Sequence, residues 1–307
     1  MHAIGPDKLA LSDVANTALL TAFCRAHETL RPQPLLVDRP SAAIVERLTP
    51  LLERSPSRLH RRLAAGKLRD DMVVHIALRA RQYDAYARDF LARRPGGWIV
   101  NLGCGLDTRF WRLDEPGERT VRLIDLDLPE MIALRREFVG ETDRYRMFPS
   151  SVLDHRWMDR VARQAAGAPL LFLAEGLFMY LPQAEVEALV VALRARFPGS
   201  ELVFEAVNRR WLRPAMRWMI RVKMRYELGL GPDTDYRFGI ADSREPESWT
   251  PGIRLLGEWV YLDVDEPRIG PIRRLRGLSI MRHTQWTARY ALGEPPPADS
   301  GYVSSDM

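Results

Sequence analysis

The chain has 307 residues, of which 46% are hydrophobic and 28% charged. This composition is typical of a globular protein large enough for a core domain with a cap. Two cysteines, Cys24 and Cys104, exclude a disulfide framework. With no recognisable signal segment, they predict a reducing cytoplasm. No apolar run approaches the roughly 18 residues of a membrane span, so we expect no membrane partner.

The net charge of +5 raises the question of nucleic-acid binding. Almost all the basic residues are arginines, which are spread among acids and form no basic tail or nucleic-acid motif. We therefore expect no nucleic-acid partner. The six histidines and two cysteines lack the spacing of metal ligands, so no metal site is predicted.

The first 94 residues are predicted to form a helical segment. Apolar periodicity and breaker residues place helices over 12–30, with Ser12 as N-cap, over 41–52 and over 69–93, with a proline-rich connector over 31–40. The last of these helices ends at Pro95-Gly96-Gly97.

Strands and helices alternate through residues 95–293, which predicts an α/β fold with a parallel sheet and helices on both faces. Strands are expected over 98–102, 120–126, 145–149, 169–174, 201–207, 255–262 and 280–292. Helices are expected near 108–113, 129–139, 154–165 and 183–197. The Pro/Ser/Gly-rich tail over 294–307 is predicted to be disordered.

A helical insertion over 208–250 interrupts this alternation. Arg213, Arg217, Arg221 and Arg225 recur every four residues of a helix predicted over 208–230, with Trp211 and Trp218 on its apolar side. One interpretation is a solvated basic face above a core stripe. The other is a cap over a ligand, because the insertion follows a strand whose carboxyl end faces the crevice of an α/β sheet.

A glycine loop follows the first buried strand. The run Trp98-Ile-Val-Asn-Leu ends in Gly103-Cys-Gly105, and Asp107 and Thr108 then supply capping side chains for a helix. Such a turn brings the backbone close to a nucleotide-like ligand. The alternative is a tight turn that needs glycine for its φ angles alone.

The next strand ends in two acids. Asp127, with Asp125 as the alternative, stands where a carboxylate holds the hydroxyls of a ribose, and the other acid favours the start of the following helix. A dinucleotide-binding loop usually carries a third glycine, where this chain has Thr108. The loop therefore favours S-adenosylmethionine, which has no phosphate, over NAD.

Three motifs together resemble the leucine carboxyl methyltransferase superfamily: N-L-G-C-G-L-D-T-R-F-W-R-L, D-L-D-L-P and A-E-G-L-F-M-Y-L. The N-terminal half is most similar to the tetracenomycin-type polyketide O-methyltransferases. The resemblance covers about residues 10–293. It implies a class I methyltransferase fold, Rossmann-like and doubly wound, mostly parallel with an antiparallel last strand, and with a helical N-terminal segment and cap. It also implies S-adenosylmethionine as the methyl donor.

The resemblance also assigns residues to the donor. It implies that Arg79 pairs with the donor carboxylate, whereas Arg81 points to another side of the helix. It places Glu175 near the methionine moiety, followed by Gly176 and Tyr180. A guanidinium suits a carboxylate because it can donate two parallel hydrogen bonds.

The adenine position departs from the family pattern. The family often has Asp-Leu there, and this chain has Val152-Leu153, so Ser151, Asp154 or backbone groups would have to replace the acid. The family's N-terminal lysine contact has no clear match either, and Thr21 stands near its place.

These features predict an S-adenosylmethionine-dependent O-methyltransferase that acts on a carboxyl or hydroxyl of a small molecule, such as a polyketide-like metabolite. A carboxylate is favoured, because a phenol would require a base, and His75 and His283 are weak candidates. The alternatives are an NAD(P)-dependent oxidoreductase and a non-catalytic regulatory protein that binds S-adenosylmethionine.

Overall fold

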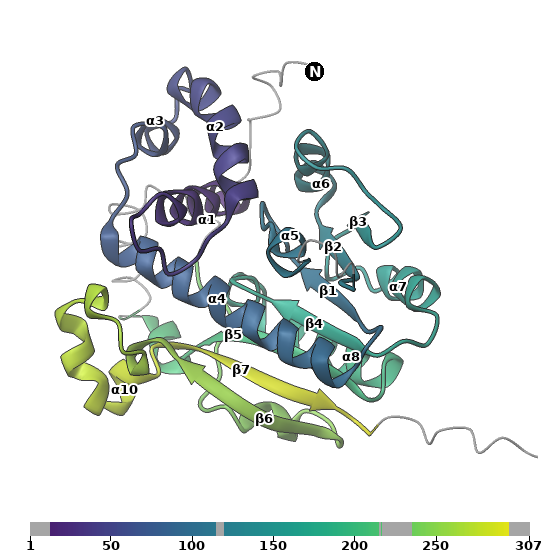
Figure 1. Cartoon of the computed structure of the whole chain (residues 1–307). Helices are drawn as coiled ribbons and strands as arrows, with labels where there is room; N and C mark the ends of the chain where they lie inside the picture. Colours follow the sequence, from purple (N-terminus) through teal and green to yellow (C-terminus); the bar gives the residue numbers. More distant parts are fainter. Residues whose placement is uncertain (1–12, 115–119, 215, 217–234, 295–307) are drawn as a thin grey trace, which may run out of the picture.

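The computed structural model describes residues 13–114, 120–214, 216 and 235–294. Within these residues the centre is a seven-stranded sheet in the order β3-β2-β1-β4-β5-β7-β6. The first five strands are parallel, and β7 lies antiparallel between β5 and β6 (Figure 1). The strands are β1 Trp98–Leu102, β2 Leu123–Asp127, β3 Tyr145–Pro149, β4 Leu170–Ala174, β5 Ser200–Val207, β6 Ile253–Val260 and β7 Gln285–Leu292. The predicted mixed sheet is confirmed.

Helices cover both faces of the sheet, so every residue of its central strands β1 and β4 is buried. Ile99 and Leu171 pack in one cluster with α4 (Asp70–Arg93), α5 (Arg109–Leu113) and α6 (Pro129–Arg136). Val100 and Phe172 point the other way, toward α7 (Trp157–Ala165) and α8 (Gln183–Arg196). This alternation of side chains follows from the period of two of a strand.

Three further helices lie at one end of the sheet (Figure 1): α1 (Asp13–Thr29), α2 (Arg39–Glu53) and α3 (Arg58–Ala64). They pack against the first half of α4, the residue Leu106 of the glycine loop and α6. The second half of α4 packs against the sheet through Tyr83 and Phe90. Because α4 belongs to both clusters, the boundary predicted at residue 94 does not separate two cores.

Several predicted boundaries differ from the structure. The helix α3 was not predicted, and the last strand begins at Gln285, because the residues before it form α10 (Ser279–Arg282). The remaining short helices are 3-10 turns: η2 Phe178–Tyr180, η3 Arg209–Leu212, η6 Glu245–Ser248, η7 Tyr261–Asp263, η8 Pro267–Ile269 and η9 Pro271–Gly277. Of the helices in the described ranges, none has the length and apolar character needed to cross a membrane.

The predicted insertion is described only in part. Its beginning is the 3-10 turn η3 rather than an α-helix, and residues 235–250 are irregular apart from η6. The arginine ridge from Arg217 onward and Trp218 lie outside the described residues, as do Ser12 and the tail from residue 295.

Candidate active site

A cavity of about 1510 Å³ lies at the carboxyl ends of the parallel strands, where open α/β sheets bind their ligands. Its walls come from the loops after β1, β2, β3 and β4, from α1 and α4, and from segments around β7. It brings together nine of the residues predicted for the donor site: Arg79, Gly103, Gly105, Asp107, Asp127, Val152, Glu175, Gly176 and Tyr180. The other two, Asp125 and Leu153, do not line it.

The glycine loop is fixed by its own hydrogen bonds. The amides of Gly103 and Cys104 donate to the carbonyl of Leu126, and the amide of Gly105 donates to Asp127 Oδ2 at 2.7 Å. Three successive amides are therefore used inside the protein and do not form the cradle that a pyrophosphate requires. Both glycines have positive φ angles, +62° and +50°.

The two acids of β2 have different surroundings. Asp127 lines the cavity, and its Oδ1 accepts from the amide of Leu128 at 2.7 Å. Asp125 is only 2% exposed and is used behind the cavity wall, where it pairs with Arg135 and accepts from the hydroxyl of Tyr145 at 2.6 Å. Of the two alternatives, Asp127 is the carboxylate that reaches the cavity.

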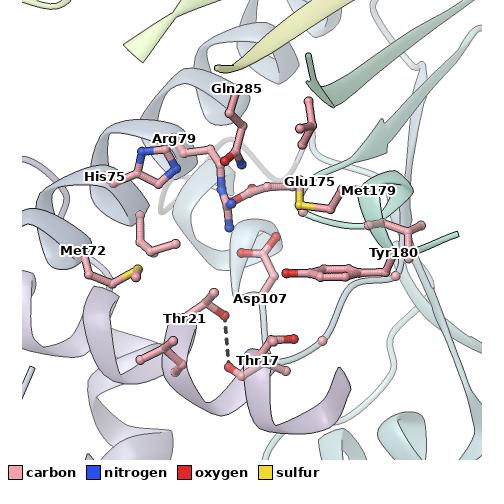
Figure 2. A pocket seen from close by; sticks show the side chains of 18 of the residues that line it. Thr17, Thr21, Met72, His75, Arg79, Asp107, Glu175, Met179, Tyr180 and Gln285 are labelled. Atoms are coloured by element: carbon pink, nitrogen blue, oxygen red, sulfur yellow. Dashed lines mark hydrogen bonds and ion pairs between the residues drawn. The ribbon is translucent and has the colours of Figure 1, made fainter. Parts of the chain in front are cut away.

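Arg79 projects from α4 into the cavity (Figure 2). Its Nε donates to Glu175 Oε1 at 3.0 Å and its Nη1 to Glu205 Oε2 at 2.9 Å. In the described part of the chain, Nη2 makes no hydrogen bond, and it lies 3.3 Å from the point where a Cβ on Gly176 would stand. Arg79 is 7% exposed whereas Arg81 is exposed, as their positions on the helix predict.

Glu175 joins this site to a buried ion network. Its Oε2 accepts from Arg109 Nη2 at 2.5 Å. Burial alone would raise the pKa of Glu175, but Arg79 and Arg109 outweigh it and hold the pKa below its usual value. The carboxylate is therefore ionised at neutral pH.

The capping roles predicted for Asp107 and Thr108 are wrong. Neither makes a capping hydrogen bond at α5. Asp107 pairs instead with Arg109 at 2.7 Å and Arg112 at 2.9 Å, and Thr108 donates to Asp38. The local sequence could not reveal this, because Asp38 comes from the distant start of α2, where it is also the N-cap.

The position predicted for the adenine is partly apolar. Val152 lines the cavity together with the two serines Ser150 and Ser151, whereas Leu153 packs against the core. The carbonyl of Val152 is held by the indole Nε1 of Trp157 at 3.0 Å. One part of the cavity is called the glycine-loop side and is lined by Arg79, Gly103, Gly105, Asp107, Asp127, Val152 and Glu175.

An aromatic cluster forms another part of the wall. Met179, Tyr180, Trp211, Tyr236 and Met281 pack together and line the cavity, and we call this part the aromatic side. The rings of Tyr180 and Tyr236 lie 5.8 Å apart. The buried Nε1 of Trp211 has no hydrogen-bond partner within the described ranges. Apart from Tyr180 and Trp211, these residues were not predicted, since they are isolated side chains: Met179 and Met281 lie in the short helices η2 and α10, and Tyr236 lies in an irregular segment.

The two histidines considered as bases differ in position. His75 lines the cavity, and its ring lies 4.6 Å from that of Tyr261. Burial, with Arg79 nearby, lowers the pKa of His75 to about 3, so it is neutral and a weak base. His283 does not line the cavity and contacts Glu258 at 3.0 Å. Among the described residues no cluster of acids, histidines and cysteines could hold a metal ion.

The model of the leucine carboxyl methyltransferase family matches residues 18–194, which contain the glycine loop, both acids of β2 and Glu175. The chain belongs to this family. It is an S-adenosylmethionine-dependent methyltransferase. The alternative of an NAD(P)-dependent oxidoreductase is therefore not supported.

Two relatives match along most of their length. The tetracenomycin polyketide synthesis O-methyltransferase TcmP of Streptomyces glaucescens is 34% identical over 84% of this chain and 86% of its own. The S-adenosyl-L-methionine-dependent methyltransferase dpfgK of Gibberella zeae is 30% identical over 91% of this chain and 92% of its own. The crystal structure of a DUF574 family protein from Streptomyces avermitilis shares the fold, with a TM-score of 0.50 at 14% identity over 88% of this chain and 96% of the other.

Proposed function

We propose that this methyltransferase transfers the methyl group to an oxygen atom, a carboxyl or hydroxyl, of a small polyketide-like molecule in the cytoplasm. The observation that carries the proposal is the size and division of the cavity. Sites for a single small ligand measure about 300–1,000 Å³, and this cavity of about 1510 Å³ exceeds that range. It has room for a donor on the glycine-loop side and an acceptor on the aromatic side.

The glycine-loop side suits the donor at each end. Asp127 would accept from the ribose hydroxyls, and the apolar wall at Val152 would contact the adenine. The donor's amino-acid end carries a carboxylate and an ammonium group. The unoccupied Nη2 of Arg79 suits the carboxylate, and the ionised Glu175 suits the ammonium. Gly176, whose φ is +63°, lets the backbone approach.

The aromatic side suits a flat acceptor. Tyr180, Trp211 and Tyr236 offer ring faces, and Met179 and Met281 offer adaptable thioether contacts. The relative TcmP is named as a polyketide synthesis O-methyltransferase, which supports the same acceptor class.

The chain's own groups act by binding and orientation. When bound, S-adenosylmethionine supplies an electrophilic methyl group. The walls hold the acceptor oxygen in line with it and exclude water, and such positioning supplies much of the rate of a two-substrate reaction. A carboxylate acceptor needs no base, and the low pKa of His75 makes it a poor base for a phenol. We therefore favour a carboxylate.

The test is methyl transfer from isotopically labelled S-adenosylmethionine to a panel of aromatic carboxylic acids and matched phenols. Mild alkali then separates the outcomes, because a methyl ester releases methanol whereas a methyl ether does not. We expect labelled ester. Label on nitrogen or carbon, or on neither type of oxygen acceptor, would contradict the proposal, and label bound but never transferred would favour the non-catalytic regulatory alternative.

A further inference from the structure

Glu205 is a second carboxylate on Arg79 that the donor site as described does not use. It stands near the carboxyl end of β5, is 2% exposed and does not line the cavity. It accepts from Arg79 Nη1 at 2.9 Å and from Gln285 Nε2 at 2.5 Å. Arg79 is thus held between Glu175 and Glu205, and Figure 2 shows its guanidinium directed toward Glu175 in the cavity.

The charges around this arginine do not balance. The connected ion network contains four arginines, Arg25, Arg79, Arg109 and Arg112, and five carboxylates, Asp38, Asp84, Asp107, Glu175 and Glu205. Glu175 is shared by Arg79 and Arg109, whereas Glu205 pairs only with Arg79 among these arginines. Five carboxylates against four arginines leave one negative charge in excess. Burial raises the pKa of Glu205, which indicates that this charge is incompletely compensated.

The donor carries the charge that would balance this excess. Its carboxylate and ammonium groups cancel each other, and its sulfonium leaves one positive charge. The product S-adenosylhomocysteine is a neutral thioether with the same amino-acid end. With Arg79 on the ligand carboxylate and Glu175 on the ammonium, Glu205 is the acid that remains for the sulfonium charge.

We propose that Glu205 is a specificity-determining residue that makes the site favour the charged donor over the neutral product. Glu205 acts through its electrostatic field and not by contact with the donor, because Arg79 lies between Glu205 and the cavity. In a buried site with few water molecules, an uncompensated charge acts over a longer range than at the surface. Transfer of the methyl group removes the positive charge, so the interaction with Glu205 is lost and product release is favoured.

The test is the ratio of the two dissociation constants, measured by calorimetry for S-adenosylmethionine and S-adenosylhomocysteine. In Glu205→Gln the amide oxygen still accepts from Arg79, so the arginine stays in place while the charge is removed. We expect donor binding to weaken about tenfold and product binding to change less than about threefold. Glu205→Asp, which keeps the charge, should keep the wild-type ratio.

A second variant neutralises the charge of Glu205 from the neighbouring strand β7, whose residue Gln285 contacts it. Gln285→Lys places an ammonium beside Glu205 and should lower the donor preference as Glu205→Gln does, even if the latter fails to fold. The matched control is Glu201→Gln, because Glu201 lies on the same face of β5 but pairs with Arg93 and Arg289 outside the cavity. Its ratio should equal that of the wild type.

If Glu205→Gln and Gln285→Lys weakened the binding of both ligands equally, the inference would be overturned. Glu205 would then serve only to position Arg79. An unchanged ratio in both variants would overturn it too. Because both ligands are bound without any acceptor, these results do not depend on oxygen being the methylated atom, and a failed search for the acceptor leaves them intact.

Discussion

The glycine-loop side and the aromatic side of the cavity are lined by different kinds of side chain. On the glycine-loop side the cavity is shaped by charged side chains, each held by one or more partners: Arg79 by two glutamates, Asp107 by two arginines and Asp127 by two amides. The aromatic side is a cluster of rings and thioethers. The first arrangement fixes groups in one geometry, as an invariant donor requires. The second adapts to shape, as a variable acceptor requires.

The largest effect is expected from a substitution of Arg79, which tests whether the glycine-loop side binds the donor. Arg79→Ala should weaken S-adenosylhomocysteine binding by about 2–5 kcal/mol, the cost of removing one partner of a buried charge pair. Arg81→Ala, the matched control from an exposed position, should leave it unchanged. Calorimetry measures the dissociation constant of S-adenosylhomocysteine for both variants. A larger effect of Arg81→Ala than of Arg79→Ala would show that the donor binds elsewhere.

The second effect concerns the glycine loop, where binding and folding are coupled. Gly105 has a φ of +50°, and a Cβ there would lie 2.9 Å from the Cβ of Ala18 on α1. Gly105→Val should therefore abolish donor binding and also destabilise the fold by about 1 kcal/mol or more. Gly140→Val is the control, because a Cβ at that position meets nothing within 4 Å. Full donor affinity in a folded Gly105→Val protein would exclude the loop from the site.

The third effect separates the two sides directly. Trp211→Ala removes one ring from the aromatic side. The KM for the acceptor should rise about tenfold, consistent with the loss of the apolar contact and stacking that the ring supplies. The dissociation constant of the donor should stay within about threefold. A change in donor binding without a change in acceptor KM would show that Trp211 belongs to the donor side.

The smallest effect is the response of stability to pH, which should come from the buried ion network that contains Asp38. Burial alone would raise the pKa of Asp38, but Arg112, Arg25 and the hydroxyl of Thr108 outweigh it and lower the pKa. Such a group stabilises the fold above its unfolded pKa of about 3.9, and the stabilisation is lost as the pH falls through the folded value.

The melting temperature should therefore fall as the pH drops below about 4, with a shallower slope in Asp38→Asn. Parallel slopes would refute a role for Asp38. The aromatic side should not contribute in acid, because burial raises the pKa of Tyr180 to about 12.

The sequence predicted the sheet and part of the site, because both depend on local patterns. Apolar β-branched runs located the strands from Trp98–Leu102 to Ser200–Val207 with small errors at their ends. The rule that an acid at the end of a buried strand faces the crevice found Asp127 and Glu175. The same rule does not indicate Glu205, because it lies within the predicted strand 201–207 and does not line the cavity.

What the sequence by itself determined is therefore the kind of donor, since the glycine loop and the strand-end acids stand in short motifs whose geometry the backbone dictates, and the family resemblance added Arg79. Only the tertiary structure decided which partner each charge has. Asp107 was predicted as a cap but became an ion-pair partner, because folding brings α2, α4 and α5 together and a buried charge must find an opposite one. The aromatic side was likewise decided by folding, because the packing of short segments that are distant in the sequence leaves no local pattern in it.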